Sequence, residues 1–303
     1  MIPQTDHIEQ LQMELKYKKC IIKNKLIIEN NEKLKSLRFI QNLNITDLQI
    51  QQCINTTFDV ALSNLKSLTA TNCKLNDLKG IQNITGLIEL NLSHNTIIDI
   101  SQISKLTNLQ ILDLRSNSIV DLRPIGKLPL KQLGLFKNNI QDISCLQNLN
   151  EIIELNLAYN EVIDISALAL LKQLKHLSLY KNKVVHINSL TSFQFSSLYL
   201  SNNYILDLKD LKCHQNIDSY FFGEQIKPTP QHVLQSERMI QIYKKTQILK
   251  QLQQMKNKLK IYKQTTTISI QQFMQQQTNN SMGFIIKIDR LFLQLNYFDG
   301  SYQ

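Results

Sequence analysis

Two consecutive stretches, Leu87 to Asn108 (LIELNLSHNTIIDISQISKLTN) and Leu109 to Pro129 (LQILDLRSNSIVDLRPIGKLP), carry the same pattern of residues. The frame begins again at four later positions and, less regularly, at two earlier ones: Leu130, Ile152, Leu174, Phe195, Leu65 and Ile45. Successive units start 20 to 22 residues apart, and looser units begin at Lys23 and Ile217. Self-similarity at such a period is the signature of stacked structural repeats.

The residues at fixed positions of the unit predict its local structure. Leu at positions four and six alternates with polar residues, which predicts a short strand with one buried face. Strands of successive units are expected to stack in parallel, about 4.8 Å apart. Position nine is Asn, or Cys in Cys53 and Cys73, and its side chain is expected to bond buried backbone groups in a ladder. The usual Asp at position thirteen is expected to bond backbone N–H groups rather than calcium.

The L-x-x-L-x-L-x-x-[N/C]-x-L pattern, over roughly residues 23–226, resembles that of leucine-rich repeat proteins. The second half of the unit, I-x-D-[IL]-x-x-L-x-x-L, is similar to the short 22-residue class, which includes internalins and a regulatory subunit of protein phosphatase 1. The resemblance implies an α/β leucine-rich repeat solenoid. Its curved parallel sheet lies on the concave side and short helical or extended segments lie on the convex side.

Three regions are predicted along the chain. Because no repeat buries its apolar face alone, we expect residues 1–22 to form a capping helix for the solenoid of residues 23–230. Thr229 as N-cap and Pro230 at the first helical position begin a basic helical tail, residues 231–303.

The tail carries eight basic residues and no acidic one between Arg238 and Lys263. This charge is compatible with a solvated helix face, or with contact to nucleic acid or another anionic surface. The apolar residues of the tail follow an approximate heptad spacing that Lys residues interrupt. A coiled coil is therefore also compatible with the pattern. We therefore expect a monomer or a tail-mediated dimer.

Composition narrows the class of protein. The 303 residues include 34 Lys and Arg against 24 Asp and Glu, and 43% are hydrophobic, which excludes a disordered chain. No apolar run reaches the 18 or so residues of a membrane helix. The start, MIPQTDHIEQ, lacks the features of a secretory signal, and five scattered Cys form no disulfide framework. A cytoplasmic or nuclear location is therefore expected.

Signatures of catalysis and metal binding are missing from the sequence. It contains no Gly-rich phosphate loop and no H-E-x-x-H, C-x-x-C or G-x-S-x-G motif, and its six His share no ligand spacing. We therefore expect a protein that is not an enzyme and that has no catalytic residue, metal site or cofactor.

Positions three, five, seven and eight are predicted to face solvent on the concave side, where they would contact a ligand. These positions are small, polar or acidic in the N-terminal units and partly aromatic in the C-terminal units. The predicted partner-binding residues are Phe136, Tyr159, His176, Tyr180, Tyr199, Asp113 and Arg115. Exposed aromatic residues on a rigid surface are typical of interface hot spots, although solenoids also carry isolated ones without function.

The sequence thus predicts a non-catalytic intracellular scaffold or adaptor that binds a protein partner on the concave face. The resemblance allows a regulatory-subunit role. Nucleic acid is not the expected ligand of that face, because four acidic residues lie on it: Asp47, Glu89, Asp113 and Glu154. The alternative function is binding of nucleic acid or an anionic surface, or oligomerisation in a cytoskeletal assembly, through the tail.

Overall fold

A computed structural model describes residues 17, 21–32, 34, 36–54, 56–206 and 219–221 of the chain. The chain divides into two compact units, Met1–Val233 and Leu234–Gln303, and the described residues belong to the first. Most of the predicted N-terminal capping helix lies outside the described residues. So do the predicted helix start at Thr229 and Pro230 and the whole tail.

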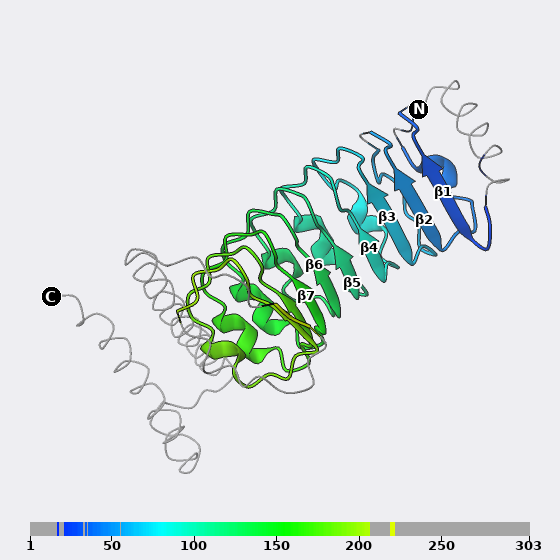
Figure 1. The fold of residues 1–303 in the computed structure, drawn as a ribbon. Helices are drawn as coiled ribbons and strands as arrows, with labels where there is room; N and C mark the ends of the chain where they lie inside the picture. Colours follow the sequence, from blue (N-terminus) through cyan, green and yellow to red (C-terminus); the bar gives the residue numbers. More distant parts are fainter. Residues whose placement is uncertain are drawn as a thin grey trace, which may run out of the picture. The chain divides into compact units, whose positions relative to one another are not determined.

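Ten parallel strands form one sheet in the part of the chain that the structure describes, and their spatial order follows the sequence (Figure 1). The strands are β1 (Lys25–Glu29), β2 (Asp47–Gln51), β3 (Ser67–Thr71), β4 (Glu89–Asn91), β5 (Ile111–Asp113), β6 (Gln132–Gly134), β7 (Glu154–Asn156), β8 (His176–Ser178), β9 (Ser197–Tyr199) and β10 (Ser219–Phe221). The sheet is curved and does not close, because β1 pairs only with β2 and β10 only with β9. This is the predicted leucine-rich repeat solenoid.

The register of the sheet follows the sequence repeat without a slip. Position three of one unit pairs with position three of the next, as in Glu89 with Ile111. A one-residue shift would move every Leu of a strand from the core to solvent, so the alternation fixes the pairing. Leu90 and Leu92 are 1% and 0% exposed, which confirms that positions four and six share the buried face.

The convex side of the solenoid is made of short 3-10 helices. They are η1 (Arg38–Ile40), η2 (Ile81–Asn83), η3 (Ser101–Lys105), η4 (Arg123–Ile125), η5 (Ser144–Asn148), η6 (Ser166–Leu170) and η7 (Asn188–Leu190). Ile100, Ile103 and Leu106 pack from this side into the core and are at most 1% exposed. None of the helices in the described ranges is long and apolar enough to cross a membrane.

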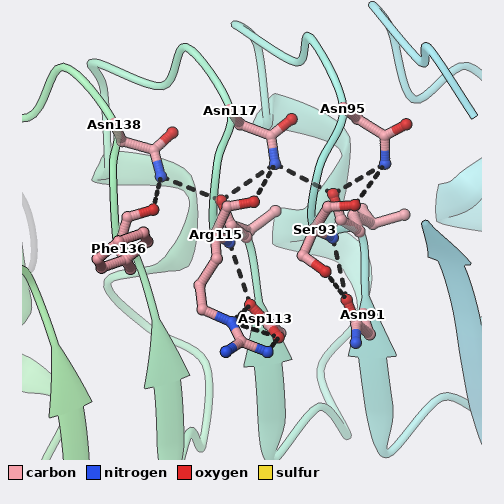
Figure 2. A network of polar contacts seen from close by, with 10 residues as sticks. Asn91, Ser93, Asn95, Asp113, Arg115, Asn117, Phe136 and Asn138 are labelled. Carbon is pink, nitrogen blue, oxygen red and sulfur yellow. Dashed lines mark hydrogen bonds and ion pairs between the residues drawn. The ribbon is translucent and has the colours of Figure 1, made fainter. Parts of the chain in front are cut away.

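A ladder of Asn side chains at position nine joins the units from β4 to β9 (Figure 2). Asn117 Nδ2 donates to the carbonyls of Leu92 in the preceding unit and Leu114 in its own, both at 3.0 Å. Its Oδ1 accepts the N–H of Ile97 at 3.0 Å. The other Asn residues repeat this geometry, so the predicted ladder is confirmed.

Two Cys residues continue the ladder toward the N-terminus. The Cys53 thiol lies 3.4 Å from the Gln51 carbonyl, and the Cys73 thiol lies 3.3 Å from the Thr71 carbonyl. Both side chains are fully buried, and this burial raises the pKa of both thiols. They occupy the Asn slot as weak donors, as the repeat frame predicts.

Asp side chains at position thirteen close the turn into the convex side. Asp99 Oδ1 accepts the N–H of Ser101 at 2.8 Å, and Asp121 Oδ1 accepts the N–H of Arg123 at 2.9 Å. This is the backbone role expected from the sequence. Within the described residues no three His, Cys, Asp or Glu side chains gather to hold a metal ion.

Candidate functional site

The predicted binding residues fall into two groups. His176, Tyr199 and Asp113 lie on strands and face the solvent side of the sheet, called here the concave face. The others occupy positions seven and eight, just beyond the carboxyl ends of the strands. Backbone hydrogen bonds to the next unit continue there, and the backbone becomes left-handed at position eight. We call this edge the carboxyl rim; its members among the predicted residues are Arg115, Phe136, Tyr159 and Tyr180.

Three aromatic rings meet on the carboxyl rim and form the aromatic cluster, Phe136, Tyr159 and Tyr180. The ring centroid of Tyr159 lies 4.9 Å from that of Phe136 and 5.2 Å from that of Tyr180, and both pairs are arranged edge to face. The middle unit has the small, buried Ala158 at position seven, which leaves room for Tyr159 to reach between the flanking rings. Such contacts hold the rings in fixed orientations, each worth about 0.5–1.5 kcal/mol beyond area burial.

Tyr159 has a backbone conformation that bulky residues rarely adopt. Its φ is 56°, in the left-handed region, and its side chain is 38% exposed. Position eight is left-handed in the neighbouring units too, but there it holds polar residues: Asn30, Gln52, Asn72, His94, Ser116, Lys137, Lys181 and Asn202. The left-handed conformation is thus a feature of the repeat, and what distinguishes this unit is an exposed aromatic residue where the other units have polar ones.

A lysine from the next unit lies against the cluster. Lys181 Nζ is 4.8 Å from the centroid of the Tyr159 ring and 5.8 Å from that of Tyr180. Both distances are within the range of a cation–π interaction. The outer surface of the cluster therefore combines aromatic edges with a positive charge.

Asp113 and Arg115 bind one another next to the cluster. Arg115 Nε and Nη2 donate to the Asp113 carboxylate at 2.9 and 2.6 Å (Figure 2). This hydrogen bond raises the pKa of the guanidinium. Gly134 at position five of β6 gives the pair space, because a Cβ there would lie 3.0 Å from Asp113 Oδ1.

The same Asp-Leu-Arg geometry recurs away from the rim. Arg123 donates to the carboxylate of Asp121 through Nε and Nη2, which lowers the pKa of Asp121. The Asp113–Arg115 pair is therefore explained by local sequence alone. It neutralises a charge at the rim without pointing to a ligand.

His176 and Tyr199 lie on β8 and β9, away from the rim. His176 Nδ1 is hydrogen-bonded to Ser197 Oγ at 2.9 Å across the two strands. Tyr199 pairs in register with Ser178 and is 37% exposed. The structure thus brings three of the seven predicted residues together in the cluster and places these two on the strands.

A polar cleft of about 800 Å³ lies at the N-terminal end of the same rim and was not anticipated from the sequence. It is lined by Asn30, Asn31, Glu32, Gln52, Ile54, Asn72, Lys74, His94, Asn95 and Thr96. The sequence signal was the run of amide side chains at position eight of the first units. None of the predicted binding residues lines this cleft.

Comparisons with known proteins agree with this architecture. The family model described as leucine-rich repeats (2 copies) matches residues 85–127. An internalin of Listeria monocytogenes is 28% identical, with a TM-score of 0.53 over 63% of this chain and 72% of its own. A leucine-rich repeat protein of Leptospira interrogans is 25% identical, with a TM-score of 0.52 over 68% of this chain and 57% of its own. Curated protein sequences gave no match. The repeat frame, the solenoid and these similarities together show that the chain contains leucine-rich repeats and folds as a leucine-rich repeat solenoid.

Proposed function

We propose that this protein is a non-catalytic binding module, an intracellular scaffold or regulatory subunit, that holds a protein partner against its aromatic cluster. The leucine-rich repeat fold is commonly a protein–protein interaction module. The observation that carries the proposal is the contact of Phe136, Tyr159 and Tyr180 at the rim, with Tyr159 exposed in a left-handed conformation. Tyr199 and His176 extend the surface onto the concave face.

The rigidity of this surface supports the proposal. Aromatic side chains with few rotatable bonds contribute large contact areas while losing little conformational entropy on binding. The rings contact one another across three units whose backbones are joined by the Asn ladder. A partner would meet a pre-organised surface, which is a property of residues that dominate binding energy.

Affinity capture from a cell lysate, quantified by mass spectrometry, tests the proposal. The full chain is compared with the triple variant Phe136→Ser/Tyr159→Asn/Tyr180→Ser. The control is Ile98→Ser/Val120→Ser/Leu170→Ser, which removes three other exposed apolar side chains. Thermal unfolding of all three proteins establishes that they are folded.

The proposal requires partners that are captured by the wild type and the control and lost from the aromatic variant. Equal capture by the aromatic variant contradicts it. A further comparison with the chain truncated after Pro230 separates partners held by the tail, since these would be lost on truncation alone.

A further inference from the structure

Two lysines flank Tyr159 at the same position of the repeat. Lys137, Tyr159 and Lys181 all occupy position eight of consecutive units, with φ of 55°, 56° and 51°. Because the backbone geometry repeats, their side chains leave the carboxyl rim from equivalent points roughly 4.8 Å apart. The backbone of Tyr159 therefore lies between those of two lysines, and Lys181 Nζ lies 4.8 Å from the centroid of its ring.

Neither lysine has a carboxylate partner among the described residues, whereas neighbouring cations do. Arg115 is paired with Asp113, and Lys183 lies 3.4 Å from Glu161. Lys137 and Lys181 belong to none of the four ion pairs found in the described ranges. Lys137 and Lys181 thus carry positive charges beside the aromatic cluster that no ion pair in the described ranges neutralises.

Among the acidic residues of the concave face, Asp113 is paired with Arg115, whereas Glu89 and Glu154 lie at the other end of their strands. Glu89 and Glu154 occupy position three, five residues before position eight, so they are separated from the rim by up to roughly 16 Å. Glu154 nevertheless acts on the rim, because the pKa of Arg115 is raised mainly by Asp113 and to a lesser degree by Glu154. The nearer Glu161 is engaged by Lys183 and by Gln141 Nε2.

The position of Lys181 distinguishes between an acidic and a basic ligand. Its ammonium group already lies over the faces of Tyr159 and Tyr180, which are the surfaces that a ligand cation would seek. An incoming cation would have to displace a tethered one and would be repelled by Lys137. A carboxylate meets both ammonium groups without displacing anything.

We propose that the carboxyl rim of β6–β8 recognises an acidic protein segment in which an apolar side chain lies between carboxylates. The apolar side chain packs on Phe136 and the edge of Tyr159, and the carboxylates bind Lys137 and Lys181. This inference rests on the proposed function and adds the chemistry of the partner to it.

Fluorescence anisotropy with the full chain and three labelled peptides tests the inference. Each peptide has Gly-Ser flanks and a five-residue core: Glu-Glu-Phe-Glu-Glu, Lys-Lys-Phe-Lys-Lys, or Glu-Glu-Ser-Glu-Glu. We expect the first to bind at least tenfold more tightly than the other two. Its affinity should fall several-fold between about 50 and 200 mM salt, because the ion pairs are exposed.

The variant Lys137→Asn/Lys181→Asn should lose at least tenfold in affinity for the first peptide. Asn already occupies the same left-handed position at Asn72 and Asn202, so the backbone is expected to be undisturbed, which the melting temperature checks. The control Lys105→Asn/Lys127→Asn removes two exposed charges away from the rim and should bind like the wild type.

Failure of the acidic peptide to bind, or equal binding of the lysine peptide, overturns the inference. Unchanged affinity in the rim lysine variant also overturns it. In each of these cases the proposed function still stands if the aromatic variant loses its captured partners from the lysate. The two proposals can therefore fail separately.

Discussion

The Asn side chain at position nine satisfies buried backbone groups that no strand or helix reaches. Its two amide hydrogens and its carbonyl oxygen connect two successive units, and Asn117 is 8% exposed. An unsatisfied buried donor or acceptor costs about 1–3 kcal/mol. The ladder therefore acts mainly by avoiding the cost of unsatisfied backbone groups, without which the units could not stack.

We expect Asn117→Ala to lower the free energy of unfolding by about 2–4 kcal/mol, because four hydrogen bonds are lost together. Asn117→Cys should lose less, since a thiol bonds backbone carbonyls in this slot at Cys73. Urea unfolding followed by circular dichroism measures both. Asn108→Ala is the control, as Asn108 is exposed and makes one bond, to the Thr85 carbonyl. A change within about 0.5 kcal/mol for Asn117→Ala would show that water satisfies the turn.

The buried thiols predict a loss of stability in alkaline solution. Burial raises the pKa of Cys73 in the folded chain above its ordinary value of 9.0. Above about pH 9 the unfolded chain releases this proton and the folded chain retains it, so stability falls as the pH rises. The urea midpoint should fall further between pH 8 and 10 in the wild type than in Cys53→Ser/Cys73→Ser. Tyr and Lys residues titrate in both proteins, so an equal fall in the two would contradict the prediction.

The element that repeats is a short strand, a left-handed turn and a convex segment. Strands from β4 onward have three residues, so the strand itself supplies few hydrogen bonds and the turns must be equally well defined. The turn before η2 shows how tightly the turns of neighbouring units pack. Gly80 has φ of 93°, and a Cβ there would lie 2.3 Å from the Phe58 carbonyl oxygen.

Gly80→Ala is expected to destabilise the chain by at least about 2 kcal/mol, through backbone strain and this contact together. Gly80→Asn separates the two causes, because Asn tolerates the left-handed region but still carries a Cβ. We expect both variants to unfold at similarly low urea concentrations. Recovery of the wild-type midpoint by Asn would mean that strain alone governs this position.

Much of the element was predictable from local, periodic signals. Leu90 and Leu92, Asn95 and Asp99 have roles fixed by spacing within one unit, and the structure gives them those roles. The aromatic cluster was predictable as a set of exposed residues but not as a contact. Its formation depends on the left-handed turn at Tyr159 and on the small Ala158, which are properties of neighbouring units together.

At the scale of the whole described unit, the sheet is a row in which each strand touches only its neighbours. Inner strands are hydrogen-bonded on both sides, whereas β1 pairs with β2 alone. At the N-terminal end of the described sheet, the ring centroids of Tyr17 and Phe39 are 5.1 Å apart. The Tyr17 hydroxyl accepts a hydrogen bond from Asn31 Nδ2. Stability in such an array is a sum of repeat and interface contributions.

Hydrogen exchange followed by mass spectrometry should show the strongest protection in β4–β8 and weaker protection in β1. The reason is that an edge strand opens by breaking one interface, and inner strands need two to break. Protection of β1 equal to that of β5 would contradict this gradient. It would mean that residues preceding β1 bond its free edge as firmly as a strand does.

The fixed step of the sheet limits the length of a straight partner. Units advance by roughly 4.8 Å, whereas one turn of an α-helix advances 5.4 Å. A helix laid along the rim would drift by roughly 1.2 Å over the three units of the aromatic cluster, and by roughly 4 Å over eight units. Over about three units the turns of a straight helix stay aligned with the units of this rim. A longer contact requires a partner that bends or is extended.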